Sequence, residues 1–311
     1  MNIKFAHLSH LGPRSSLIIN QGLVQLEHNF DVDKSYRING IIVKPRCLDL
    51  LRNIHQYDLI FCGNPIYKDF LNQSNLWKKI IWYDYGDLAT LDDECLTKSI
   101  AYFKRSLVTE NRSIMKYSSK VFHLDYCVLE EYLNDNNSER SIDVACLFEK
   151  DAGGRRSILV QKLTNSNFEN SIIGKTTSYG SEGRNSINKY NNENYKNYLQ
   201  ILGDSKIIFT AFPQNHDGDS RTWEAFASGA LVFRDVTFIK TKNEPKDGVH
   251  FFCFDSSKPK SISLAIEKAI TFLNNDAERN LIATACLEIM KSHHMAKNRV
   301  DYMIKTTLLR I

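Results

Sequence analysis

Short apolar runs alternate with amphipathic segments along most of the chain. The runs are rich in β-branched and aromatic residues and are bounded by turn-forming residues, which is typical of buried strands. They fall at 3–8, 58–63, 79–87, 106–111, 120–125, 142–148 and 168–174. Segments with helical spacing lie between them, among them 15–28, 47–55 and 65–71. Strands separated by helices predict an α/β fold with a parallel sheet and helices on both faces.

An asparagine-rich polar segment at 131–141 interrupts this alternation, which then starts again. The 311 residues also exceed the usual size of one hydrophobic core, so two domains are expected. We place an N-terminal domain at 1–138 and a C-terminal domain at 139–311. Both are expected to be Rossmann-like.

The stretch 207–233 is the most informative part of the second half. Its residues predict a strand, a polar loop, a short helix and a second strand. Trp223, Phe226, Ala227 and Ala230 follow helical spacing, which predicts one buried helix face. Asp219 or Ser220 is expected to cap the amino end of this helix.

Gly229 stands where a left-handed residue ends such a helix. The polar face then carries Arg221 and Glu224, at the carboxyl end of a strand, where ligands bind in open α/β sheets. The free amides near Ser220 and the helix dipole favour an anion there. An ordinary solvated Arg–Glu pair is the plainer interpretation.

Composition narrows the class of protein. A net charge of +4 suits an anionic ligand, but it is smaller than the positive charge expected of a dedicated nucleic-acid-binding protein. Seven scattered cysteines without a C-x-x-C pair indicate a reducing compartment, so we expect a cytoplasmic protein. No run approaches 18 apolar residues, so no membrane span is expected.

The run R-T-W-E-A-F-A-S-G-A-L-V-F, from Arg221 to Phe233, resembles the R-x-x-E-A-x-A-x-G signature of nucleotide-sugar glycosyltransferases of the GT-B fold. It is most similar to the branch of spore-maturation-type and exostosin-like transferases. The resemblance covers about residues 140–311, including Y-x-x-x-L-x-x-S-K-I at 198–207. It implies two domains facing a cleft, a terminal helix packing back on the first domain, and donor ribose bound by Glu224.

Two arginines also match this resemblance. The family carries R-R at the start of a helix in the second domain, where this chain has Arg155 and Arg156, although Phe148 and Glu149 replace the glycine that ends the family's preceding strand. Arginines at a helix start suit a diphosphate, whereas a surface arginine and an acid-paired one are the plainer interpretation.

Two further donor-binding candidates are weaker. Gly12 lies in a turn after the first strand, where backbone amides can approach a ligand, although the turn lacks a G-x-G-x-x-G pattern. His216 lies eight residues before Glu224, where retaining members of the broader fold carry another glutamate, and is a candidate for the donor sugar.

Asp84 and Asp87 follow a strand of the first half and are candidate bases for an acceptor hydroxyl. Solvated loop acids are the plainer interpretation. Asp217-Gly-Asp219 is interpreted as a helix cap, and the adjacent His293 and His294 as surface residues, so neither a metal nor a cofactor is expected.

The sequence therefore predicts a metal-independent glycosyltransferase, with a nucleotide diphosphate sugar as donor. The acceptor hydroxyl is that of a glycan, a small molecule or a modified DNA base. The open alternatives are a sugar-nucleotide epimerase of the same fold and a non-catalytic nucleic-acid-associated protein.

Overall fold

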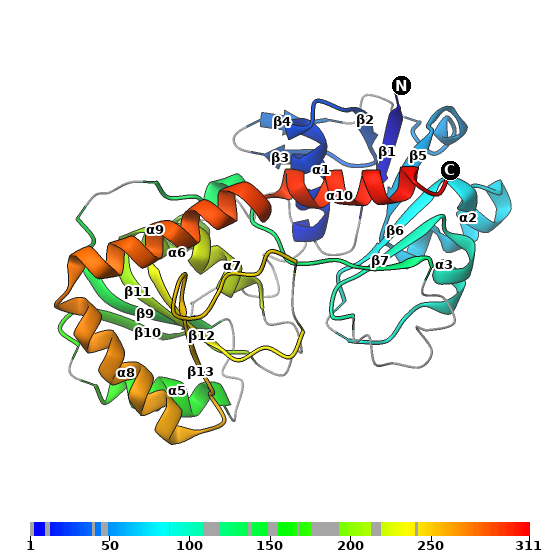
Figure 1. Cartoon of the computed structure of the whole chain (residues 1–311). Coiled ribbons are helices and arrows are strands. Elements are labelled where there is room, and N and C mark those ends of the chain that lie inside the picture. Colours follow the sequence, from blue (N-terminus) through cyan, green and yellow to red (C-terminus); the bar gives the residue numbers. More distant parts are fainter. Residues whose placement is uncertain are drawn as a thin grey trace. The chain divides into compact units, whose positions relative to one another are not determined.

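The computed structural model describes residues 3–9, 13–38, 41–44, 49–86, 88–107, 119–135, 139–148, 155–166, 168–175, 193–212, 219–239 and 242–311. These residues fall into two compact units (Figure 1). Unit 1 contains the described residues up to Leu129 together with Met295–Ile311, and unit 2 contains those between Glu130 and His294.

Unit 1 is built on a parallel sheet with the strand order β2-β1-β5-β6-β7-β8. Its strands are β1 Lys4–Leu8, β2 Asn29–Val32, β5 Leu59–Cys62, β6 Ile80–Asp84, β7 Ala101–Lys104 and β8 Val121–His123. The four residues of β5 are all buried, as are those of β7, which fits a sheet covered on both faces. A separate antiparallel pair, β3 Tyr36–Ile38 and β4 Ile41–Val43, lies outside this sheet.

The helices of unit 1 are α1 Pro13–Gln25, α2 Lys68–Ser74, α3 Asp93–Lys98 and α10 Ala296–Leu308, with 3-10 turns η1 Ile54–Gln56, η2 Pro65–Tyr67 and η3 Trp77–Lys79. The C-terminal helix α10, red in Figure 1, packs along α1. The approach is so close that a Cβ at Gly22 would lie 2.3 Å from Cγ2 of Val300. A glycine inside α1 therefore makes room for α10.

Unit 2 has a second parallel sheet with the order β10-β9-β11-β12-β13. Its strands are β9 Ile142–Phe148, β10 Ser171–Lys175, β11 Ser205–Thr210, β12 Leu231–Asp235 and β13 Phe252–Phe254. Its helices are α5 Arg155–Thr164, α6 Glu193–Asp204, α7 Ser220–Ala227, α8 Pro259–Leu273 and α9 Asp276–His293, with the 3-10 turn η4 Glu130–Tyr132.

Helices flank the sheet of unit 2 in two groups. α5 contacts α8, whereas α7 contacts α9. In the central register, Ile207 of β11 lies between Val144 of β9 and Leu231 of β12, and all three side chains are fully buried. The predicted α/β fold is confirmed, since each unit contains a parallel sheet with helices packed against it.

Two elements expected from the sequence differ from the structure in their described parts. The helix expected at 47–55 is absent from its described part, where only Ile54–Gln56 forms a 3-10 turn. Of the strand expected at 106–111, residues 106 and 107 are described and are not in a strand: Ser106 has a left-handed φ of 55°, and the described strand here is β7, Ala101–Lys104. Residues 108–111 lie outside the described residues. A lysine at position 104 argues against a buried strand when only the sequence is known. In the structure Lys104 is nevertheless 1% exposed, and its Nζ lies 3.1 Å from Oδ1 of Asp84.

Within the described residues, no helix combines the length and the apolar character that crossing a membrane requires.

Candidate functional site

The strand order of unit 2 creates a switch point between β9 and β11. The chain leaves β9 toward β10 on one side, and it later returns to form β11 on the other side. In open α/β sheets the crevice at the carboxyl ends of two such strands is where ligands bind. The segments that follow these ends lead into α5 and α7, which begin at Arg155 and Ser220.

Arg156 occupies this edge from the side of β9. Its Nε donates to the carbonyl oxygen of Ala211 at 2.8 Å, and its Nη2 donates to Oδ2 of Asp219 at 2.9 Å. The guanidinium also stacks on Phe148, with 4.6 Å between Cζ and the ring centroid. Arg156 is buried, at 7% exposure. It therefore joins the end of β9 to the segment that follows β11.

Asp219 organises the start of α7. Its Oδ1 accepts from the backbone N–H of Thr222 at 3.1 Å, which caps the helix. Its Oδ2 accepts from Arg156 and lies 3.7 Å from Nη1 of Arg221. Of the two expected caps, Asp219 is the one used, while Ser220 is the first, half-buried residue of the helix. One carboxylate thus serves two arginines and the helix end.

The far end of α7 is closed as the sequence predicts. Gly229 has φ of +70°, a left-handed conformation that glycine adopts without steric cost. Trp223 and Phe226 are buried, so the apolar face of the helix is fixed. These features hold Arg221 and Glu224 in place on a short helix.

Glu224 is not solvated, as the plainer interpretation of an exposed Arg–Glu pair would require. It is buried, at 3% exposure, and its Oε2 accepts a hydrogen bond of 2.5 Å from the hydroxyl of Tyr198 on α6. A buried carboxylate needs such a donor, because removing a charge from water is costly. Any ligand of Glu224 must therefore either bind beside the Tyr198 hydroxyl or displace it.

The sequence did not reveal Tyr198 as a partner of Glu224. It forms part of the Y-x-x-x-L motif, but nothing in the sequence links it to a residue 26 positions later.

Four other residues predicted for the site cannot be placed. Gly12, Asp87 and His216 lie outside the described residues, and Arg155 is described only as the first residue of α5.

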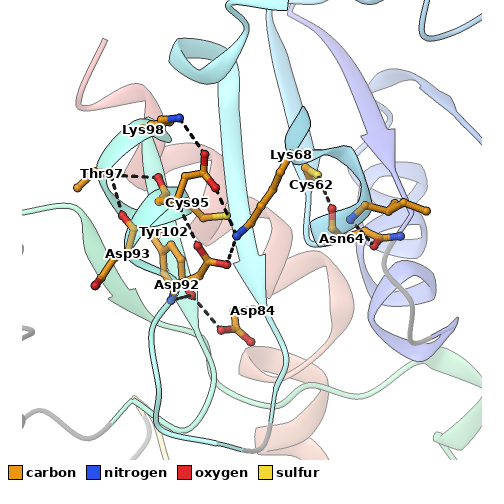
Figure 2. A network of polar contacts seen from close by, with 12 residues as sticks. Cys62, Asn64, Lys68, Asp84, Asp92, Asp93, Cys95, Thr97, Lys98 and Tyr102 are labelled. Carbon is orange, nitrogen blue, oxygen red and sulfur yellow. Dashed lines mark hydrogen bonds and ion pairs between the residues drawn. The ribbon is translucent and has the colours of Figure 1, made fainter. Parts of the chain in front are cut away.

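Asp84 lies in unit 1 at the carboxyl end of β6, within the polar network of Figure 2. Its Oδ1 accepts from the backbone N–H of Gly86 at 2.7 Å and lies 3.1 Å from Nζ of Lys104. Its Oδ2 accepts from the hydroxyl of Tyr102 at 2.9 Å. Both oxygens are thus engaged, which favours a structural role for Asp84 over that of a general base.

The same network continues onto α3 (Figure 2). The hydroxyl of Tyr102 accepts from the backbone N–H of Asp92, and the Asp92 carboxylate accepts from Lys68 at 2.5 Å. Burial by itself would raise the pKa of Asp92, but the hydrogen bonds from Lys68 and from the backbone of Cys95 lower it below its ordinary value. These contacts tie the loop after β6 to α2 and α3.

Among the described residues, no cluster of three or more His, Cys, Asp or Glu side chains is arranged to hold a metal ion. The expectation of two surface histidines is wrong for His294, which is fully buried. Its ring lies 4.8 Å from that of Trp223, and its Nε2 is 2.8 Å from the carbonyl oxygen of Asn243. The burial of His294 therefore follows from tertiary packing against Trp223 and from its contact with Asn243.

Residues 155–305 match a protein family described as glycosyl transferase-like. The matched region begins with α5 and contains α6 and α7, and so includes both arginines at the switch point together with Tyr198 and Glu224. No curated protein sequence matches the chain.

The solved structures that are similar to the whole chain include the following three. A glycosyltransferase from Rickettsia africae ESF-5 shares 11% identity over 99% of this chain and 98% of that one, with a TM-score of 0.67. Anabaena Alr3699/HepE, in complex with UDP and glucose, shares 10% identity over 99% and 100%, with a TM-score of 0.61. The catalytic domain of starch synthase IV from Arabidopsis thaliana, bound to ADP and acarbose, shares 10% identity over 100% and 99%, with a TM-score of 0.60.

At these identities the similarity establishes the fold, which is that of GT-B glycosyltransferases. The family match adds that residues 155–305 are similar to a family described as glycosyl transferase-like. Together the findings support a glycosyltransferase, and they favour neither a sugar-nucleotide epimerase nor a non-catalytic nucleic-acid-associated protein.

Proposed function

We propose that this chain transfers a sugar from a nucleotide diphosphate donor to an acceptor hydroxyl, with the donor bound at the carboxyl edge of the unit 2 sheet. The observation that carries the proposal is the arrangement at the switch point between β9 and β11. Two arginines meet there at one carboxylate, beside the amino ends of α5 and α7. A diphosphate matches such a site in both charge and hydrogen-bond acceptors.

The leaving group explains why cations belong at this edge. As the bond between sugar and phosphate breaks, negative charge grows on the diphosphate, so groups that bind it more strongly then will accelerate the reaction. Arg221 is the first candidate, because it lies in the first turn of α7 and its side chain is 18% exposed. Arg156 is deeper and is bonded to Ala211 and Asp219, so we assign it to holding the edge in shape.

The remaining roles are as follows. Glu224 accepts hydrogen bonds from the donor ribose, and Arg155, Ser220, His216 and Gly12 are further candidates for donor contacts. The acceptor, which is a glycan, a small molecule or a modified DNA base, binds unit 1. For an inverting reaction Asp87 removes its proton, since the contacts of Asp84 leave it a structural role.

The finer family is the spore-maturation-type and exostosin-like branch. The R-x-x-E-A-x-A-x-G run of α7 and the Y-x-x-x-L-x-x-S-K-I run of α6 and β11 support this assignment. We also propose a cytoplasmic location, which the scattered cysteines support. Those described are unpaired, at positions 62, 95, 127, 146, 253 and 286.

Calorimetric titration with uridine, adenosine and guanosine diphosphates tests the donor site. We expect at least one to bind the wild-type protein, and Glu224→Gln to weaken that binding about ten- to a hundredfold, since hydrogen bonds to a charged group contribute about 1.5–3 kcal/mol. Glu278→Gln is a matched control, because Glu278 lies in the exposed first turn of α9. Equal affinity of a folded Glu224→Gln protein and the wild type would remove the ribose assignment.

A further inference from the structure

Tyr198 and Glu224 are joined by a hydrogen bond, and the proposed function gives no role to Tyr198. The two residues lie on different helices, α6 and α7, and neither is more than 4% exposed. Their oxygens are 2.5 Å apart. This is the length of a charge-assisted bond between a hydroxyl and a carboxylate.

The direction of both helices places this contact near the carboxyl edge of the unit 2 sheet, where we propose that the donor binds. The amino end of α7 follows the carboxyl end of β11, while the carboxyl end of α6 leads directly into the start of β11. Each helix therefore has its amino end toward the carboxyl edge of the sheet. Tyr198 is in the second turn of α6 and Glu224 in the second turn of α7.

A buried glutamate inside a short helix has few ways to be held in one orientation. Its side chain has three rotatable bonds, and its neighbours on α7 are the apolar Trp223 and Ala225. A hydroxyl donor on Oε2 selects one orientation of the carboxylate. Since each carboxylate oxygen can accept two hydrogen bonds, the bond from Tyr198 does not by itself prevent Glu224 from also accepting from a ligand.

We propose that Tyr198 is a positioning residue for donor recognition: its hydroxyl fixes the carboxylate of Glu224 so that it can accept from the vicinal hydroxyls of a ribose. This rests on the proposed function and extends it, because a carboxylate held for a diol selects ribonucleotide over 2′-deoxyribonucleotide donors. Tyr198 itself acts through Glu224 and does not contact the reacting atoms.

A movable cover is the opposite possibility. There the Tyr198 hydroxyl would compete with the ribose for Glu224, and its removal would strengthen nucleotide binding. The packing favours the positioning role, since Tyr198 is buried to 4% exposure and is followed one turn later by the equally buried Leu202 on the same helix face. An aromatic ring anchored in this way cannot swing far from its partner.

The test compares affinities for the three nucleoside diphosphates and for their 2′-deoxy forms. For the one that binds best, we expect wild type to prefer the ribose form at least tenfold. In Tyr198→Phe the ribose form should bind about tenfold more weakly, and the preference should fall to less than threefold. Glu224→Gln should lose the preference to a similar extent, and the double variant should show little further loss.

Tyr57→Phe is the matched control. Tyr57 is also buried, and its hydroxyl donates to a carboxylate, Oδ2 of Asp31, at 2.6 Å in unit 1. The Tyr57→Phe protein should retain the full preference for the ribose form of the nucleotide. Circular dichroism and thermal melting of each variant separate a loss of folding from a loss of recognition, because a purely structural bond would lower the melting temperature and leave the ribose preference unchanged.

The outcomes separate this inference from the proposed function. If none of the six nucleotides binds the wild-type protein, the proposed function fails and takes this inference with it. If wild type binds and prefers ribose, but a folded Tyr198→Phe protein keeps that preference or binds more tightly, only the positioning role is overturned.

Discussion

Arg156 and Asp219 form a buried ion pair across the ends of two neighbouring strands, with 2.9 Å between Nη2 and Oδ2. Arg156 follows β9 and Asp219 follows β11, so the pair spans the switch point of the unit 2 sheet. Arg221 approaches the same carboxylate. The carboxyl edge of the unit 2 sheet is therefore held together by charge as well as by the apolar core beneath it.

Asp219→Asn should destabilise the protein while preserving the helix cap. Asparagine caps helices as well as aspartate does, so the loss isolates the charge that faces Arg156. Breaking a buried pair and leaving one charge uncompensated costs about 3–5 kcal/mol, and we expect a value near the lower end because asparagine still accepts a hydrogen bond. Chemical denaturation followed by circular dichroism measures the change.

The control for this variant is Asp49→Asn. Asp49 lies 3.6 Å from Arg52, and the two side chains are 57% and 82% exposed, so the loss of this pair should cost only about 0–1 kcal/mol. Equal stability of Asp219→Asn and Asp49→Asn would show that burial does not strengthen the Arg156 pair.

Arg221→Ala should reduce turnover more than donor affinity. The charge of Arg221 is most valuable when the diphosphate gains negative charge in the transition state. We expect kcat to fall at least tenfold with a smaller change in KM, measured as release of nucleoside diphosphate from the nucleotide sugar that the protein accepts. Arg52→Ala removes another positive charge at an exposed position, 82% accessible, and should leave both parameters unchanged. A rise in KM alone would assign Arg221 to ground-state binding.

A nucleoside diphosphate should stabilise the protein in the presence of a metal chelator. Two arginines and the amino end of α7 offer the countercharge that a divalent cation would otherwise supply. At 100 times its dissociation constant, a ligand that binds only the native state adds about 2.7 kcal/mol, which a thermal-shift assay detects readily. Loss of the entire shift on adding the chelator would contradict metal-independent binding.

Gly229→Ala should cost more stability than Gly248→Ala. Both glycines have positive φ, +70° and +75°, so alanine pays a left-handed penalty of about 1–2 kcal/mol at either position. At Gly229 the new Cβ would also lie 2.9 Å from the backbone oxygen of Asn134 and from Nη2 of Arg140, whereas nothing lies within 4 Å at Gly248. Differential scanning calorimetry of the two variants gives the cost of the contact as a difference, and equal melting temperatures would contradict it.

Asp92→Asn should destabilise the protein at neutral pH and much less in acid. The pKa of Asp92 is lowered in the folded state, so its ionised form adds stability above the ordinary value of 3.8, and this is lost as the pH falls through the lowered folded-state pKa. Urea denaturation of wild type and variant between pH 7 and pH 3 should show the two midpoints converging.

Asp93→Asn is the control for that series. Asp93 lies in the first turn of the same helix, is exposed, and should change stability little at any pH. A constant difference between Asp92→Asn and wild type down to pH 3 would mean that the hydrogen-bond geometry, and not the charge, provides the stabilisation.

Most of the fold could be predicted because the signals are local. The run at 142–148 is apolar except for Asp143, and β9 has those bounds. The start and end of α7 follow from Asp219 and Gly229, whose roles depend on the backbone within a few residues. Local signals fail for Lys104. A lysine is expected at the surface, and its burial in β7 can be understood only from its contact with the carboxylate of Asp84, which the sequence pattern does not show.

The sequence by itself thus determined the alternation of strands and helices that makes an α/β fold, the ends of α7, and the presence of Arg221 and Glu224 on that helix. Only the tertiary structure decided what these residues touch. Glu224 meets a tyrosine 26 residues before it, and Asp219 meets an arginine 63 residues before it. Periodicity specifies which face of an element is buried, whereas the partner on that face depends on how the sheet orders its strands, and that order is a property of the whole chain.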